Sequence, residues 1–201
     1  MNYLAHLFLA GKRPLDVVAN LMGDFVRGPV DERFDTRFHD GILLHRRIDS
    51  FTDSHPIFLR SRRRLSDRHR RVSALIMDVY YDHLLARNWN AYSTESLEQF
   101  AYRTYRILAA HQDLMPPSMQ KRVTGMIKSN LLVAYRDRAT ARSVLVALEK
   151  RFRRPVTLSD SASDLRRSDP AIENDFHDFF PDLQSFVRDR STGPADTGNT
   201  A

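Results

Sequence analysis

Apolar residues recur at the three- and four-residue spacing of amphipathic helices along most of the chain, and no segment sustains the alternation of a half-buried strand. This pattern predicts helices over residues 2–10, 14–27, 31–54, 94–111, 117–130, 138–151 and 170–190, and a long helix from residue 66 or 67 to about residue 90. We therefore expect an all-α fold, a single-domain helical bundle that spans residues 1–190.

Proline and glycine mark several of the predicted boundaries. Pro14 suits the first turn of a helix, and Gly28-Pro29 ends that helix. The helix that starts near residue 31 should end before His55-Pro56, because a residue that precedes proline disfavours the α conformation.

The second half of the chain carries further breaks at the Pro-Pro pair 116–117 and the Arg-Pro pair 154–155. Asp169 and Pro170 have the residue types of an N-cap and a first helical position, and Pro181 should kink or split the helix that follows. Residues 191–201 are small and polar, so we predict a disordered tail.

Composition narrows the classes of protein. The 201 residues suffice for one domain with a core or at most two small ones, and the absence of cysteine excludes disulfides, thiolate zinc sites and cysteine nucleophiles. The apolar N-terminus is short, lacks a preceding basic region and is interrupted by His6, so it does not resemble a signal peptide. No segment approaches the roughly 20 apolar residues of a membrane span. We expect a cytoplasmic protein.

The formal net charge is +6 and the pI is about 9.9, which favours an acidic partner. Nucleic acid, anionic lipid and an acidic protein all fit this charge. A dense run of arginines at positions 62, 63 and 64, followed by 68, 70 and 71, is either a solvated face or a surface that binds phosphate or an acidic partner.

Two predicted helices carry ionisable residues among large apolar ones. His45 and Asp49 are four residues apart, as are Asp78 and Asp82, so each pair shares a helix face. Charge in apolar surroundings is costly unless it is paired or binds a metal. If the two helices pack face to face, these residues form a mixed nitrogen and carboxylate metal site in the core.

Other interpretations of the same residues remain open. His45 and Asp49 are also consistent with a hydrogen-bonded pair, or with surface ions that pair with Arg46 and Arg47. One of the two aspartates at 78 and 82 could instead point to solvent or pair with arginine. Asp24 also lies in an apolar context and is a further candidate ligand.

Two histidines are candidates for proton transfer. His83 follows Asp82 and points about 100° away from it, so it either reaches the same site from another angle or supports the ligands. His6 lies in an apolar helix, where a core histidine bonded to a backbone carbonyl is the commoner case, but it could also act as a ligand, an acid or a base. The chain contains no Walker loop, G-x-S-x-G or H-E-x-x-H motif.

At these same positions the chain resembles a known family. The matching segments are residues 1–7 (MNYLAHL), 20–26 (NLMGDFV), 41–56 (GILLHRRIDSFTDSHP) and 78–83 (DVYYDH). In this order they resemble the bacterial acyl carrier protein phosphodiesterases, over residues 1 to about 90. The second half resembles the family mainly in its helical character.

The resemblance implies hydrolysis of holo-acyl carrier protein to the apo form and 4′-phosphopantetheine, in the setting of fatty acid biosynthesis. It also implies a divalent metal, typically Mn²⁺, with Mg²⁺, Co²⁺ and Fe²⁺ as alternatives, and a distant relation to the HD phosphohydrolases. Those enzymes carry an adjacent His-Asp pair, whereas this chain offers His45-x-x-x-Asp49 and the reversed order Asp82-His83. The ligand set is therefore open.

These expectations give each candidate a role. A metal-activated water attacks the phosphodiester, and His6 or His83 protonates the leaving serine oxygen. The predicted metal ligands are Asp24, His45, Asp49, Asp78 and Asp82; the residues expected to support them are Arg46, Asp53 and His55; those expected to bind the acidic carrier protein are Arg62, Arg63 and Arg64.

Two other functions are compatible with the same sequence. One is an HD-like metal phosphohydrolase that acts on a nucleotide or another small phosphodiester. The other is a non-catalytic basic helical module that binds nucleic acid or anionic lipid, although we consider nucleic acid the weaker choice. Binding that depends on salt concentration and is unaffected by a chelator would favour the non-catalytic module.

Overall fold

The computed structural model describes residues 1–32, 34–150, 152 and 156–191, and this part of the chain is helical, without a strand. The α-helices are α1 (Tyr3–Leu9), α2 (Pro14–Met22), α3 (His39–Ser54), α4 (Pro56–Arg62), α5 (Ser73–Arg87), α6 (Leu97–Ala110), α7 (Pro117–Lys128), α8 (Leu131–Ala134), α9 (Arg138–Glu149) and α10 (Ala162–Ser191). Short 3-10 turns are η1 (Thr36–Phe38), η2 (Asp67–Val72), η3 (Trp89–Ala91), η4 (Gln112–Leu114) and η5 (Ser159–Ser161). The predicted all-α class is confirmed.

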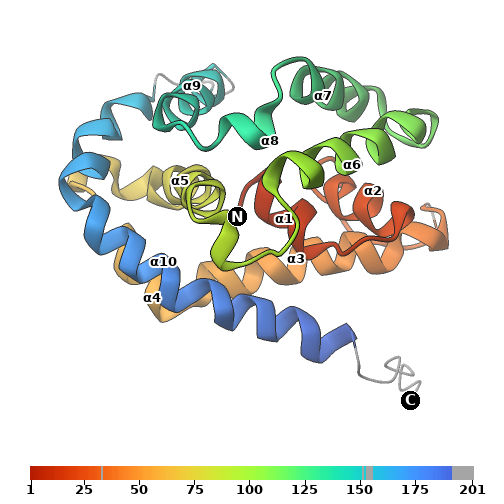
Figure 1. The fold of residues 1–201 in the computed structure, drawn as a ribbon, viewed down its shortest axis with the longest axis horizontal. Helices are drawn as coiled ribbons and strands as arrows, with labels where there is room; N and C mark the ends of the chain where they lie inside the picture. The colour runs from red at the N-terminus through yellow and green to blue at the C-terminus, as the bar shows by residue number, and fades with distance from the viewer. Residues whose placement is uncertain (33, 151, 153–155, 192–201) are drawn as a thin grey trace.

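The helices surround α1 and the chain's N-terminus (Figure 1). Helix α1 packs on α2 and α5, α2 packs closely on α3, and α10 runs along the outside against α4. Leu4, Leu7, Val18, Leu84 and Phe179 are completely buried where these helices meet. Removing such apolar surface from water is the main stabilising term in a fold of this kind.

Several helix boundaries have local causes in the sequence. Helix α3 ends at His55-Pro56, and Pro56 then occupies the first turn of α4 while the imidazole of His55 accepts a hydrogen bond from a backbone N–H of α4. Ser96 and Gln99 form a capping box at the start of α6. The predicted break at 116–117 is confirmed, because α7 begins at Pro117.

Other predicted boundaries were wrong. Helix α2 ends at Met22 rather than residue 27, and α3 begins at His39 rather than residue 31, because Asp35 caps the short turn η1 in front of it. Residues 56–62 form α4, which the sequence pattern did not predict. The helix expected from residue 66 starts as η2, where Asp164 of α10 binds Ser66 through its backbone N–H and its hydroxyl.

Helix α10 starts eight residues earlier than predicted, so Asp169 and Pro170 lie inside it instead of forming its N-terminus. The carboxylate of Asp169 contacts Tyr80, Arg87 and Arg138 from other helices. These tertiary contacts outweigh the loss of one helical hydrogen bond at an internal proline. The helix also continues through Pro181 without splitting.

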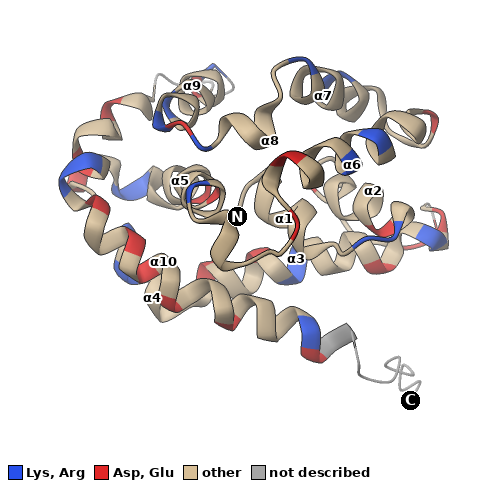
Figure 2. Ribbon diagram, in the orientation of Figure 1, with Lys and Arg blue, Asp and Glu red and all other residues tan. Residues whose placement is uncertain are grey.

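Charged residues of α4 lie beside those of α10 (Figure 2). Arg60 and Arg64 both donate to the buried carboxylate of Asp175, at 2.8 Å and 2.7 Å. Ser61 donates to the same carboxylate at 2.8 Å. These contacts, together with the apolar faces of the two helices, attach α4 to α10 and set its direction after α3.

No helix in the described ranges is both long and apolar enough to cross a membrane. The predicted break at 154–155 and nearly all of the predicted tail, residues 192–201, lie outside the residues that the structure describes.

Candidate metal centre

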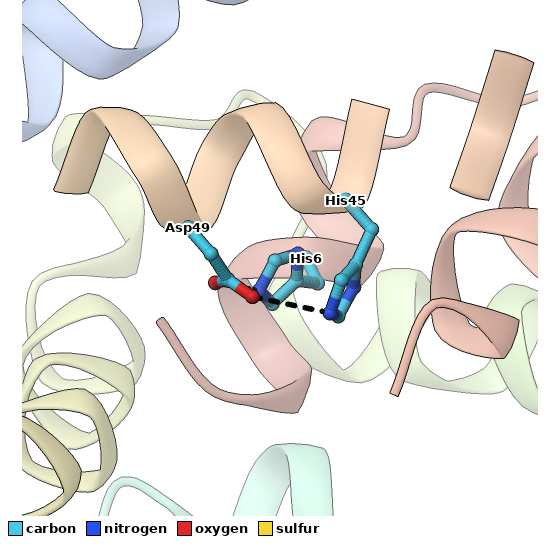
Figure 3. A group of neighbouring side chains, drawn as sticks. All are labelled: His6, His45 and Asp49. Atoms are coloured by element: carbon cyan, nitrogen blue, oxygen red, sulfur yellow. Dashed lines mark hydrogen bonds and ion pairs between the residues drawn. The ribbon is translucent and has the colours of Figure 1, made fainter. Parts of the chain in front are cut away.

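His6, His45 and Asp49 converge where α1 crosses α3 (Figure 3). Asp49 Oδ1 lies 3.0 Å from His6 Nε2, and Asp49 Oδ2 lies 3.3 Å from His45 Nε2. The two imidazole rings stack with their centroids 3.9 Å apart. One possible ligand atom from each residue lies within 4.8 Å of the others, which suits a single ion bound by two nitrogens and one oxygen.

The three side chains differ in access to solvent. His6 and His45 are buried, whereas the side chain of Asp49 is 43% exposed. The imidazoles are therefore covered, whereas the carboxylate of Asp49 leaves the cluster open to a substrate on its side.

Two further carboxylates border the cluster. Asp24 follows α2, and its Oδ1 lies 3.7 Å from His45 Nε2. Asp78 on α5 reaches it through the α-amino group of Met1, which lies 2.9 Å from Asp78 Oδ1 and 3.5 Å from Asp49 Oδ1. These two carboxylates could complete the coordination of an ion held by the central three residues.

Electrostatics favour the protonation states that metal ligands need. Burial lowers the pKa of His6 to about 4, so its imidazole is neutral at pH 7. Burial alone would raise the pKa of Asp49, but hydrogen bonds with His45 and His6 have a larger effect and hold the pKa of this carboxyl well below its usual range. A neutral imidazole and an ionised carboxylate are the ligand forms of these groups.

The Nδ1 atoms of His6 and His45 are unusual for buried polar atoms. Nδ1 of His6 and Nδ1 of His45 are buried and have no hydrogen-bond partner within the described part of the chain. Both rings thus direct only Nε2 toward polar neighbours, which are the carboxylate of Asp49 and, for His45, also that of Asp24. Two imidazole ligands and a carboxylate fit Mn²⁺, Fe²⁺ or Co²⁺ better than Mg²⁺, which prefers oxygen ligands.

Gly23 fixes the ring of His45. A Cβ atom at position 23 would lie 2.4 Å from Cγ of His45, far inside van der Waals contact. Gly41 has a similar role one helical turn before His45, since its Cβ would lie 2.4 Å from Cβ of Ala19. These two glycines let α2 approach α3 closely enough to cover the imidazole. Gly23 was not predicted as a functional residue; its signal in the sequence is its place just before Asp24.

Asp82 and His83 do not join the cluster. Asp82 is completely buried, and its two oxygens accept the backbone N–H groups of Leu4 at 2.7 Å and Ala5 at 3.1 Å. Burial raises the pKa of Asp82 to about 7 despite these bonds. His83 is buried as well, and its Nδ1 lies 2.7 Å from the carbonyl oxygen of Tyr135. Asp82 therefore attaches α1 to α5, which positions His6.

The three residues expected to support the ligands lie around α3. Arg46 donates to the carbonyl oxygen of Val26 at 3.2 Å and so holds the segment that carries Asp24. Asp53 is exposed near the end of α3. His55 caps α4, and its Nε2 lies 3.5 Å from Asp182 of α10.

The arginine run divides into two groups. Arg64 is held by Asp175, whereas Arg62 donates to Ser73 at 3.0 Å and lines, with Arg63 and Arg70, a hollow of about 360 Å³ between α4, η2 and the first residue of α5. The side chain of Arg63 is exposed and has no ion-pair partner among the residues described. Only part of the predicted docking run is therefore free to meet a partner.

Comparison with known proteins accords with this geometry. The family model for acyl carrier protein phosphodiesterase matches residues 1–183. A protein of Photorhabdus laumondii named acyl carrier protein phosphodiesterase is 33% identical over 182 residues, which cover 90% of this chain and 92% of the relative. A protein of the same name from Escherichia coli is 36% identical over 183 residues, 90% and 94% of the two chains. No solved structure matches this chain. The chain therefore belongs to the acyl carrier protein phosphodiesterase family.

Proposed function

We propose that this protein is a divalent-metal-dependent phosphodiesterase that hydrolyses holo-acyl carrier protein to the apo form and 4′-phosphopantetheine. The names of its relatives support the substrate and the reaction. The observation that carries the metal dependence is the convergence of His6, His45 and Asp49 from two helices in a mostly buried site.

His6, His45 and Asp49 would hold the ion, with Asp24 and Asp78 as the nearest additional carboxylates. A bound divalent ion supplies charge neutralisation of the phosphodiester and a lowered pKa of water. We favour Mn²⁺ because it accepts both imidazole and carboxylate ligands, with Co²⁺ and Fe²⁺ next and Mg²⁺ last.

The chain's own residues prepare the reaction in three ways. Burial keeps the imidazole of His6 neutral, and the two buried rings exclude water from one side of the site. The exposed side at Asp49 admits the phosphodiester. Hydrolysis then breaks the bond between phosphorus and the carrier-protein serine oxygen; the hydroxyl of water goes to phosphorus and a proton goes to serine.

The hydrogen bonds of His83 and His6 limit which of them can donate that proton. His83 donates its Nδ1 proton to the carbonyl oxygen of Tyr135, and burial lowers the pKa of His83. Its Nε2 is consequently bare at neutral pH and acts as an acid only after it takes up a proton. His6, predicted as the alternative acid, is better suited to hold the ion, since its Nε2 is directed at Asp49.

Two arginines of the run support docking of an acidic carrier protein. We assign this role to Arg62 and Arg63, which line the hollow between α4, η2 and the first residue of α5, and not to Arg64, whose guanidinium is bound by Asp175. Opposite charges at the rim of an interface accelerate association and make it salt-dependent. We further propose that the protein works in the cytoplasm, where carrier-protein-dependent fatty acid biosynthesis takes place.

The test is incubation of the purified protein with holo-acyl carrier protein and Mn²⁺, Mg²⁺ or Co²⁺, with and without EDTA, followed by intact-mass measurement of the carrier protein. We expect loss of the phosphopantetheine mass that EDTA blocks. The Asp49→Ala variant should lose turnover and keep its helical circular dichroism, whereas Asp113→Ala, an exposed aspartate on η4, should behave as wild type.

An unchanged mass with every metal would refute the carrier-protein reaction. Hydrolysis of a small phosphodiester in the same preparation would then identify the alternative metal phosphohydrolase. Turnover that is full in Asp49→Ala, or insensitive to EDTA, would refute the metal centre.

A further inference from the structure

A second hollow lies on the other side of α5 from Asp78. It has a volume of about 260 Å³ and is formed where α5, α9 and the first turns of α10 meet. Tyr80, which forms one wall, follows Asp78 by two residues and so points about 200° away from it around the helix. The hollow is therefore separate from the candidate metal centre, and an inference about it does not rest on the proposed function.

The inner surface of the hollow is apolar. Leu145 of α9 and Leu165 of α10 are buried there with the ring of Tyr80. Ala141 and Ala162 face the same space, and their small side chains leave room that a longer side chain would fill. A hydrocarbon chain placed here would exchange contact with water for contact with these side chains.

The mouth of the hollow is basic. Arg142 and Arg166 line it, and both side chains are exposed without an ion pair to any residue in the described ranges. Arg138 also lines it, but its guanidinium is bound by Asp169 of α10. Because Asp169 is already matched by Arg138 and Arg87, it does not neutralise the two exposed arginines, and the entrance is positively charged although Glu149 lies within electrostatic range of Arg142.

We propose that this hollow is a binding site for an amphipathic anion, a carboxylate with an alkyl chain of medium length. The alkyl chain occupies the space between Leu145 and Leu165, and the carboxylate lies between Arg142 and Arg166. The volume is near the lower limit of about 300 Å³ for small-molecule sites, so the ligand is small. Paired guanidinium groups recognise carboxylates through charge-assisted hydrogen bonds.

The test uses three probes that separate the two halves of the ligand. Octanoate has both the chain and the charge, octanol has only the chain, and acetate has only the charge. Titration calorimetry of the full chain with octanoate, at concentrations that do not form micelles, should show saturable binding with one site. Octanol should bind at least about tenfold more weakly, since one lost charge-assisted hydrogen bond is sufficient for that factor, and acetate should show no saturable binding.

Two variants test the location. Replacing both exposed arginines, in Arg142→Gln/Arg166→Gln, should weaken octanoate at least about tenfold, and Ala162→Leu should block the space. The matched control is Arg13→Gln/Arg106→Gln, which removes the same charge from exposed positions elsewhere and should bind octanoate as wild type. Melting temperatures establish that each variant is folded.

Three results would overturn the proposal. The first is no saturable octanoate binding by the wild type. The second is equal affinity for octanol, which would mean that the arginines do not contribute. The third is unchanged affinity in the arginine double variant, which keeps the inference refutable even if Ala162→Leu does not fold.

Discussion

The contact between Gly23 and His45 predicts that a single methyl group will impair catalysis without contacting substrate. Gly23 has φ −52° and ψ −34°, an ordinary helical conformation that alanine also adopts. The substitution Gly23→Ala therefore introduces no backbone strain, and its effect is steric. The new Cβ would lie 2.4 Å from Cγ and 2.6 Å from Cβ of His45, so the whole residue, and with it the backbone of α3, must move by about 1 Å to regain an ordinary contact of 3.4 Å or more.

The ring has little room for this movement. It already stacks on His6 at 3.9 Å, so a displacement of His45 also disturbs its distance of 3.3 Å to Asp49. Overpacking of this kind costs about 1–3 kcal/mol, which lowers the melting temperature by about 2–4 °C per kcal/mol for a chain of this size. A misplacement of about 1 Å in a catalytic group reduces the rate about 100-fold.

The assay is the initial rate of phosphopantetheine release with saturating Mn²⁺, measured for wild type and Gly23→Ala with the melting temperature of each. We expect kcat to fall about 100-fold, and KM for the carrier protein to stay close to wild type, because Gly23 contacts His45 and does not line the arginine-lined hollow. The matched control is Gly125→Ala in α7, where no atom lies within 4 Å of the added Cβ. Wild-type kcat in a folded Gly23→Ala protein would refute the argument that this contact sets the catalytic orientation of His45.

Three further predictions concern stability. Asp82→Ala should lower the free energy of unfolding by about 1–3 kcal/mol for each of the two buried N–H groups of α1 that lose their acceptor, measured by urea denaturation. Arg64→Ala should cost about 1–3 kcal/mol in the same assay because Asp175 loses a charged partner, whereas Arg63→Ala should remain within about 0.5 kcal/mol of wild type. Burial alone would raise the pKa of Asp164, but the hydrogen bonds to its carboxylate have a larger effect and hold the pKa well below its value in the unfolded chain. Wild type should therefore lose stability as the pH falls below about 4. Between about pH 6 and pH 3, the melting temperature of Asp164→Asn should depend less on pH than that of wild type. An equal change of melting temperature with pH in the two proteins would contradict this assignment.

Local patterns in the sequence were sufficient for much of the fold. The helical spacing of apolar residues gave the class, and Pro56 and Pro117 gave two of the boundaries. The four-residue spacing of His45 and Asp49 was enough to predict that they share one face of α3, since that relation depends only on helix geometry.

Relations between distant segments were decided by the tertiary structure. Asp49 and Asp82 each end a four-residue pair of ionisable residues in the sequence, but Asp49 joins the cluster whereas Asp82 binds the backbone of α1. Nothing local distinguishes them, because the difference lies in which helix packs opposite each one. The position of His6 between His45 and Asp49 is set in the same way, by the packing of α1 on α5.

The contacts of the arginine run and of α10 also depend on segments that are distant in the sequence. Arg63 and Arg64 are neighbours of one residue type, yet only Arg64 meets the buried carboxylate of Asp175, more than a hundred residues away in the sequence. Asp169 has the sequence signature of a helix start and instead binds Arg87 and Arg138 inside α10. Helical periodicity and capping are local and can be determined from neighbouring residues. Partners for buried charges come from distant segments, and their identity is fixed only when the helices pack.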